Sequence, residues 1–217
     1  MSDILHKIES GRQYRNMKIE VRKDENGDNA QNWIVRGYAT TFDEPYLLFE
    51  GEGYQFYEKV DRHAFDNTDL TDVIMQYDHE GRVFARKSND TLKLTDDDHG
   101  LLIEADLGGT EIGRQLYEEI RGGYTTKMSF GFTVDGDTME ERRDDHNQVI
   151  YTRTITSIRK LYDVSAVSLP ANDGTEISAR AFVDGVIAKA EAERLRIAEE
   201  TRKREILSLK VKLAKEI

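Results

Sequence analysis

Short stretches in which apolar and polar residues alternate recur through the first 170 residues of this chain, separated by turn-forming residues. Alternation with a period of two is typical of a β-strand that buries one face. Strands are predicted at residues 17–22, 33–39, 54–60, 73–77, 83–86, 91–94, 101–107, 127–134, 149–158 and 161–169. They do not alternate regularly with helices, which argues against a parallel doubly wound sheet. The prediction is a mainly β protein with helices, of the α+β class, built as a closed or nearly closed β-barrel decorated by helices.

The helix signals are fewer and more local. Thr110 is the predicted N-cap of a helix over residues 110–121, which carries an apolar stripe at every fourth residue and is followed by glycine. A shorter helix is predicted at residues 61–65, capped by its aspartate. Residues 83–94 are predicted to form a hairpin that turns at 88–90.

Composition divides the chain into three parts: a flexible N-terminal arm (1–16), a β-barrel domain (17–185) and a charged helical C-terminal tail (186–217). The tail holds nine Lys or Arg and six Asp or Glu, so it carries +3 of the total of −11 and leaves −14 on the rest. An acidic body argues against a phosphate-binding surface, and no nucleic-acid partner is expected.

Several kinds of functional site and of protein are excluded because the sequence lacks the residues or segments that they need. With no cysteine, the chain has no disulfide, no thiolate zinc site and no cysteine nucleophile. The N-terminus has no apolar signal core, and no segment is long and apolar enough to cross a bilayer, so we expect a soluble, intracellular protein without membrane contact.

Residues 127–132 (KMSFGF) contain a serine in the middle of an apolar strand. Alternation places Ser129 on the face opposite Met128 and Phe130. A serine on a buried strand is more often a small hydrogen-bonded residue than a nucleophile. A nucleophilic serine needs a base within hydrogen-bond reach and a third group that orients the base.

His79 is the histidine best placed to be that base, since it ends an apolar strand and can face a cleft between neighbouring strands. Any single histidine is still more often structural or solvated than catalytic. The other four are expected in the arm, a short helix, an acidic turn and a charged loop: His6, His63, His99 and His146.

Asp163 is a lone carboxylate in an apolar strand and must find a partner if it is buried. It can orient a histidine, or it can form an ion pair at the strand end with Lys127, Arg159 or Lys160. Two nearby serines compete with the one in the KMSFGF segment, but are expected to pack or to bond the backbone: Ser165 and Ser168.

Other catalytic motifs are missing. Lys127 occupies the first glycine position of the G-x-S-x-G elbow, so an α/β-hydrolase is not indicated. The sequence has no H-E-x-x-H, no recognised zinc spacing and no phosphate-binding glycine loop. We therefore expect neither a metal nor a cofactor.

Four segments occur in one order: residues 77–81 (YDHEG), 100–102 (GLL), 127–132 (KMSFGF) and 161–172 (LYDVSAVSLPAN). In this order they resemble the prohead, or capsid maturation, proteases of tailed bacteriophages. The similarity runs from about residue 35 to 179, and residues 63–65 (HAF) stand where that family often has Gly-Ala-Phe. The family is similar in fold to the herpesvirus assemblins, a β-barrel ringed by helices with a Ser-His protease site.

The resemblance implies Ser129 as nucleophile and His79 as general base. Asp163 matches the position of the orienting residue, which is often Glu in the family and His in the assemblins. The paired arginines that assist the assemblin oxyanion hole have no evident counterpart after Asp163. The oxyanion donors therefore remain unassigned.

By the same resemblance, the protein is expected to be a serine endopeptidase inside the procapsid, in the host cell cytoplasm. It would cleave scaffolding segments from the major capsid protein, and itself. The portal protein is a further candidate partner, and the assemblins suggest a homodimer or oligomer. The tail after residue 188 is a docking segment for scaffold or capsid helices, a self-cleaved piece, or a plain solvated helix. The alternatives are a catalytically silent internal scaffold or assembly factor and, with less support, a small β-barrel binding module unrelated to phage.

Overall fold

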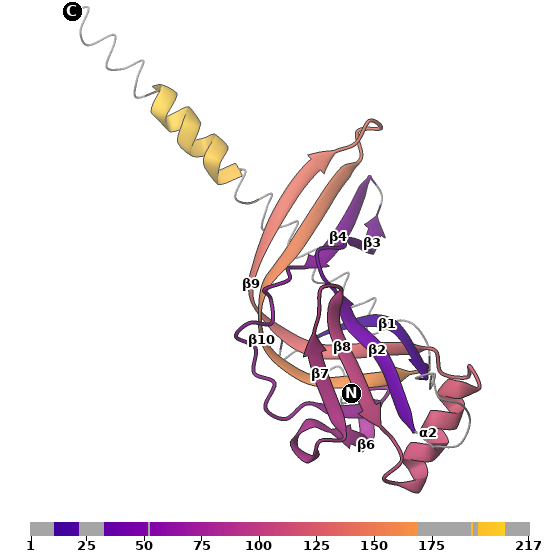
Figure 1. The fold of residues 1–217 in the computed structure, drawn as a ribbon. Coiled ribbons are helices and arrows are strands. Elements are labelled where there is room, and N and C mark those ends of the chain that lie inside the picture. Colours follow the sequence, from indigo (N-terminus) through magenta and orange to yellow (C-terminus); the bar gives the residue numbers. More distant parts are fainter. Residues whose placement is uncertain (1–10, 22–32, 52, 169–191, 193–194, 207–217) are drawn as a thin grey trace, which may run out of the picture. The chain divides into compact units, whose positions relative to one another are not determined.

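In the computed structural model, residues 11–21, 33–51, 53–168, 192 and 195–206 are described (Figure 1). The chain divides into two units, Met1–Ser178 and Ala179–Ile217, and each is described by itself. The described part of the first unit contains ten strands, one 3-10 helix and one α-helix. Their bounds are β1 (Gln13–Val21), β2 (Ile34–Thr41), β3 (Tyr46–Gly51), β4 (Tyr54–Val60), β5 (Ile74–Tyr77), β6 (Glu80–Arg86), η1 (Lys87–Asn89), β7 (Leu92–Asp96), β8 (Gly100–Asp106), α2 (Glu111–Arg121), β9 (Lys127–Arg143) and β10 (Val149–Val167).

The ten strands form one branched sheet with the order β3-β4-β10-β9-β1-β2-β8-β7, and β5 joins β10 to β6. Strand β10 runs parallel to β4 and β5, whereas the other neighbours are antiparallel. The mainly β, α+β prediction is confirmed. The closed barrel is not found: among the described strands, β3 and β7 end the order and do not pair with each other. Alternation of apolar and polar residues indicates which residues form strands, but closure of a barrel depends on pairing between strands that are far apart in the sequence.

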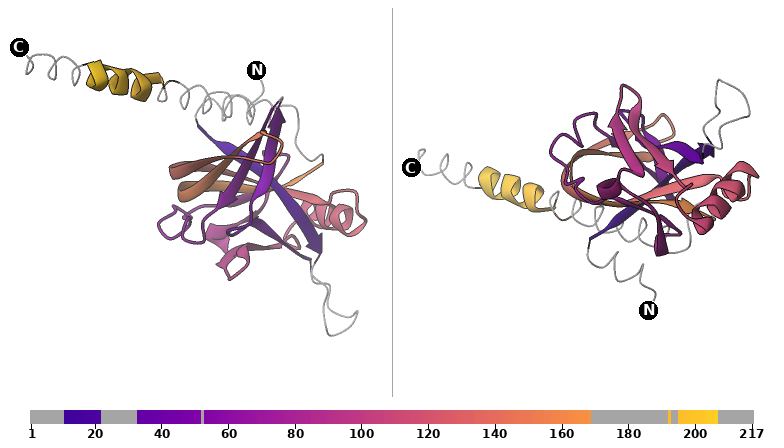
Figure 2. Two further views of the ribbon diagram at one scale, coloured as in Figure 1. Left: turned by 90° about the horizontal axis from the view of Figure 1, so that it is seen from above. Right: turned by 60° about the horizontal axis from the view of Figure 1, so that its bottom comes forward.

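Strands β9 and β10 pair with each other along their whole length, as the views of Figure 1 and Figure 2 show. The strand predicted at residues 127–134 is longer than expected, because β9 continues to Arg143 and the charged loop that holds His146 shrinks to residues 144–148. The two strands predicted at 149–158 and 161–169 are one strand with register shifts between Ile155 and Asp163. Charged side chains fit a strand here because most of residues 135–143 are exposed.

Two other local predictions are wrong. Strands β6 and β7 form no hairpin with each other, since η1 separates them and they pair with β5 and β8 instead. No helix forms at residues 61–65. Consecutive hydrogen-bonded turns take its place, in which the Asp61 side chain accepts from the His63 amide at 2.8 Å.

Helix α2 agrees with its sequence signals. The Thr110 hydroxyl accepts from the Gly113 amide, and Leu116 and Ile120 are buried. The chain leaves the helix through Gly123, whose φ of +76° is the left-handed conformation that glycine adopts without strain. Strand β1 differs from its prediction, since it begins at Gln13 rather than at residue 17 and so takes in part of the predicted arm.

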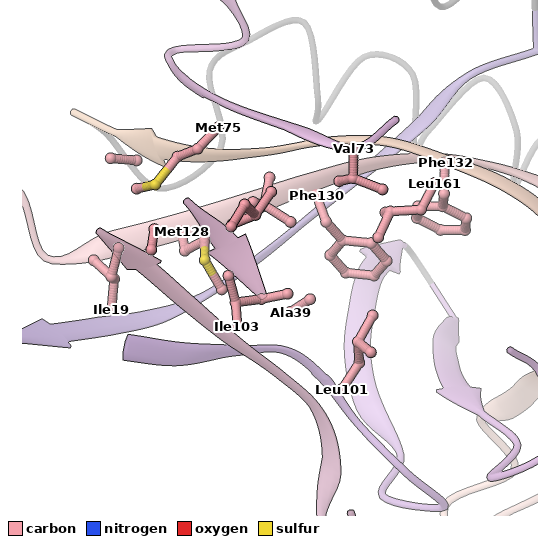
Figure 3. Close-up of a cluster of buried hydrophobic side chains, with 14 of the residues drawn as sticks. Ile19, Ala39, Val73, Met75, Leu101, Ile103, Met128, Phe130, Phe132 and Leu161 are labelled. Carbon is pink, nitrogen blue, oxygen red and sulfur yellow. The ribbon is translucent and has the colours of Figure 1, made fainter. Parts of the chain in front are cut away.

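The core face of β9 is strongly apolar (Figure 3). Met128, Phe130 and Phe132 all belong to the main hydrophobic cluster, and the two phenyl rings stack with centroids 4.7 Å apart. Side chains on a strand point alternately to its two faces. Ser129 and Gly131 therefore lie on the face of the sheet that points away from this cluster.

In the second unit, residues 195–206 are helical, as predicted for the tail. Ion pairs one turn apart join Arg196 to Glu200 at 2.8 Å and Glu199 to Lys203 at 2.7 Å. Such exposed pairs contribute only a few tenths of a kcal/mol each. The rest of the predicted tail, like residues 1–10 of the predicted arm, lies outside the described residues.

Candidate active site

The register of β9 and β10 brings the candidate serine and aspartate onto one face. Ser129 is the cross-strand partner of Ser165, and Gly131 is the partner of Asp163. No register shift separates these pairs, so all four residues point to the same side of the sheet. Three of them are almost fully buried: Ser129 and Asp163 are each 2% exposed, and Ser165 is 0% exposed.

His79 reaches this face from a two-residue hairpin turn between β5 and β6. Tyr77 and Glu80 are paired, and the two residues between them, Asp78 and His79, have φ values of 48° and 60°. Positive φ at both central positions is the pattern of a type I′ turn, which usually carries Asn or Asp followed by Gly. Histidine in the second position is a costly conformation that the surrounding contacts must hold.

Those contacts come from the end of β10. The Asp78 amide donates to the Ala166 carbonyl at 2.9 Å. The Asp78 carboxylate accepts from both the amide and the hydroxyl of Ser168, each at 2.9 Å. The turn is thus fastened to the strand that carries Asp163. Ser168, one of the two serines weighed as alternative nucleophiles, thus uses its amide and its hydroxyl to stabilise this turn.

The His79 imidazole is held from two directions. Its Nδ1 hydrogen-bonds to Oδ1 of Asp163, and the edge of its ring meets the Tyr14 ring with centroids 4.3 Å apart. A carboxylate only accepts, so Nδ1 is the protonated nitrogen while Asp163 is ionised. That tautomer leaves Nε2 as the nitrogen able to take up a proton.

Asp163 has two further neighbours. The Ser165 hydroxyl donates to Oδ1 at 3.0 Å, and Nη1 of Arg12 lies 3.6 Å from Oδ2. The Arg12 guanidinium also stacks on Tyr162, 3.7 Å from the ring centroid. A buried carboxylate is stabilised as an anion by donors and by a nearby positive charge. The alternative of an ion pair with Lys127, Arg159 or Lys160 is not found among the described residues: the arginine beside Asp163 is Arg12. Lys160 pairs with Asp69 instead, and Arg159 pairs with Asp135.

Ser129 is not joined to the imidazole. Its buried Oγ makes no hydrogen bond with any described residue, His79 included. The structure therefore brings His79 and Asp163 into direct contact and puts Ser129 on the same sheet face, without a serine–histidine bond. Catalytic hydrogen bonds are often long or misaligned before substrate binds.

His79 is the single buried histidine among the described residues. The others that the structure describes are exposed. His63 lies beside Asp66, His99 packs edge-on against Tyr38, and His146 is in the turn between β9 and β10. Sequence reasoning separated His79 from them by its place at the end of an apolar strand.

Three neighbours of the site were not predicted. Arg12 and Tyr14 fall within the arm expected at residues 1–16, where no pattern marked them. Sequence predicts that Ser165 packs or bonds the backbone, whereas its hydroxyl bonds the Asp163 carboxylate. Its two-residue spacing from Asp163 was an available signal, since it puts both side chains on one face.

A second buried polar cluster is centred on Glu58 and reaches Tyr14, whose carbonyl accepts a hydrogen bond from Arg15 at 2.7 Å. Arg15 and Arg153 both bond Glu58, at 2.5 Å and 2.8 Å for the closest contacts, and the Tyr46 hydroxyl donates to it at 2.5 Å. Burial raises the pKa of Glu58, but the charge and hydrogen bonds of Arg15, with the charge of Arg153, outweigh it and lower that pKa to about 2. Burial raises the pKa of Tyr46 as well.

The described residues contain no cluster of three or more histidine, aspartate or glutamate side chains arranged to hold a metal ion. Among the same residues, no helix combines the length and the apolar character needed to span a membrane.

The chain matches the family described as caudovirus prohead serine protease over residues 17–186, which is more than half of its length. The chain belongs to this family. Membership in the prohead serine protease family implies a serine peptidase with a role in capsid maturation, acting in the phage procapsid. No curated protein and no solved structure matches the chain. An assemblin-like fold therefore stays an expectation from sequence.

Proposed function

We propose that the protein is a serine endopeptidase in which Ser129 is the nucleophile, His79 the general base and Asp163 the residue that orients the base. The observation that carries this proposal is the hydrogen bond from His79 Nδ1 to Asp163, on the sheet face that also carries Ser129. Family membership supports the reaction class, and the contact between His79 and Asp163 supports their proposed roles.

In the proposed reaction, His79 Nε2 takes the Ser129 hydroxyl proton as Oγ attacks a peptide carbonyl. The Nδ1–H bond to Asp163 fixes the tautomer and stabilises the imidazolium that forms. The imidazolium then gives its proton to the leaving amine, and an acyl-enzyme remains on Ser129. Water, deprotonated by His79, then attacks the ester carbonyl. The bond to Ser129 Oγ breaks, the N-terminal fragment leaves with a new carboxyl group, and His79 returns the proton to Oγ. Its substrates would be the scaffolding segments of the major capsid protein and the protease chain itself.

Mass spectrometry of co-expressed protease and major capsid protein tests the proposal. Wild type should yield defined capsid-protein fragments, and Ser129→Ala and His79→Ala should each yield the uncut protein. Ser88→Ala is the matched control, since that serine is exposed on η1 and bonds Asp72. Equal processing by wild type and Ser129→Ala would show that the nucleophile is wrongly assigned.

A fluorophosphonate probe gives a second, direct readout. It should label one serine in the wild-type protein, and peptide mapping should place the label on Ser129. Labelling should disappear in Ser129→Ala and persist in Ser88→Ala.

The missing bond between Ser129 and His79 is the observation that favours the second candidate, a catalytically silent assembly factor of the procapsid. Co-expression with the major capsid protein distinguishes the protease from the silent assembly factor. A silent factor would leave capsid protein uncut with wild type and all variants, while capsids would fail to assemble when the protein is absent.

A further inference from the structure

We infer that Ser165 is a positioning residue for the proposed reaction, acting through Asp163 rather than on the substrate. The inference rests on the proposed function and assigns a role to a second serine of the same sheet face. Ser165 lies directly across from Ser129 in the register of β9 and β10, and its side chain is completely buried.

The first argument is the hydrogen bond that Ser165 makes. Its Oγ donates to Oδ1 of Asp163 at 3.0 Å, and the same oxygen receives Nδ1 of His79. A carboxylate can rotate about its last side-chain bond unless its oxygens are held. Two donors on one oxygen fix both the rotation of the carboxylate and the direction in which it can accept from the imidazole.

The second argument is the balance of charge around the carboxylate. Asp163 is 2% exposed, so water contributes little to holding its negative charge. The Arg12 guanidinium faces the other oxygen, Oδ2, from 3.6 Å, which is too long for a strong charge-assisted hydrogen bond. Among the residues that the structure describes, the side-chain donors within hydrogen-bond distance of this carboxylate are therefore His79 and Ser165.

A nucleophilic role for Ser165 does not fit its position. Its oxygen and His79 Nδ1 meet at the same carboxylate oxygen, so Ser165 lies toward the Nδ1 edge of the imidazole. The proton acceptor of a serine protease is Nε2, at the opposite edge of the ring. These two hydrogen bonds thus assign Ser165 to the support of the aspartate.

A double-mutant cycle tests this role, with a peptide that spans a cleavage site mapped by mass spectrometry as the substrate. Ser165→Ala should lower kcat by about 10- to 100-fold with little change in KM, the range for losing a hydrogen bond to a charged group. Ser165→Thr keeps the hydroxyl and should retain most of the activity. In the Asp163→Ala background, Ser165→Ala should have no further effect, because the group through which it acts is gone.

Proton NMR gives a readout that needs no substrate. A histidine Nδ1–H bonded to a carboxylate should give a low-field signal, absent from Asp163→Ala and from His79→Ala. Ser165→Ala should shift that signal, and Ser165→Thr should restore its position. Thermal unfolding of each variant shows that the comparison is between folded proteins, and Ser165→Cys, of similar volume and with a weak donor, replaces the alanine variant if that does not fold.

The inference is overturned if the variant without a strong donor (Ala, or Cys in its place) keeps kcat within twofold of wild type and leaves the low-field signal unmoved. An equal fractional loss in the Asp163→Ala background would overturn it too, since Ser165 would then act independently. The proposed function fails separately, through cleavage by Ser129→Ala. Inactive Ser129→Ala beside fully active Ser165→Ala would reject only the role of Ser165.

Discussion

Gly131 and Asp163 face each other across β9 and β10, and the carboxylate occupies the space that a side chain at position 131 would fill. A Cβ added to Gly131 would lie 2.6 Å from Oδ2 of Asp163 and 2.8 Å from Cε1 of Tyr14. Both distances are shorter than any normal non-bonded contact. The glycine in the KMSFGF segment is thus what lets a buried carboxylate lie flat against the sheet beside His79.

Gly131→Ala should displace the carboxylate and lower both activity and stability. Forcing a methyl group into a packed site costs about 1–3 kcal/mol of unfolding free energy. The measurements are cleavage of a peptide substrate and denaturant unfolding. Gly109→Ala is the control, because a Cβ there has no neighbour within 4 Å. It should leave peptide cleavage unchanged and alter the unfolding free energy by no more than about 1 kcal/mol. Wild-type activity in Gly131→Ala would contradict the packing argument.

The backbone of His79 should make glycine better than alanine at that position. Alanine pays about 1–2 kcal/mol in the left-handed conformation, partly offset because glycine loses about 0.5–1 kcal/mol more entropy on folding. We expect His79→Gly to be more stable than His79→Ala by up to about 1 kcal/mol in denaturant unfolding, with both inactive. The neighbouring strand residue gives the reverse order: Glu80→Ala should be more stable than Glu80→Gly. Alanine favoured at both positions would show that the turn has ordinary φ values in solution.

Replacing Asp163 by asparagine should lower kcat by about 10³- to 10⁴-fold. The amide can donate to Nδ1 and so select the imidazole tautomer that carries its proton on Nε2, which cannot accept the serine proton. Asp69→Asn is the matched control, since that carboxylate bonds Lys160 and Thr71 at a partly exposed site away from His79. A loss smaller than about tenfold in Asp163→Asn would show that Asp163 does not set the tautomer.

Glu58 should matter for stability and make it pH-dependent. Glu58→Gln leaves Arg15 and Arg153 without their shared anion and should cost about 3–5 kcal/mol, the usual effect of breaking a buried ion pair. Glu104→Gln, which removes a surface partner 4.0 Å from Arg36, should cost less than about 1 kcal/mol.

The pH dependence follows from the lowered pKa. A carboxylate with a lower pKa in the folded protein than in the unfolded chain stabilises the fold above the unfolded value. The pKa of Glu58 falls from its ordinary 4.5 to about 2, so its contribution should be complete above pH 4.5 and disappear as the pH falls toward 2. Unfolding free energies measured across this window should lose less with pH in Glu58→Gln than in wild type. Equal slopes would show that another group governs acid unfolding.

Sequence signals predicted correctly the helices and strands that depend on residues close together in the chain. Thr110 capping α2 and the alternation that gives β4 depend on neighbours a few residues away. Local signals failed along β9 and β10, where charged residues that resemble a loop are held as strands by pairing with each other. They failed again at β6 and β7, which are adjacent in sequence but pair with different strands.

The sequence by itself determined the mainly β class, the strand that carries Ser129 and, through four ordered segments, the candidate residues His79 and Asp163. Strand periodicity and motif order are properties of the linear chain, so they can be read without coordinates. The tertiary structure decided which groups meet at the aspartate: His79 and Ser165 on one oxygen and Arg12 facing the other. Those contacts join residues as far apart as 12 and 163, and only strand pairing sets which side chains share a face.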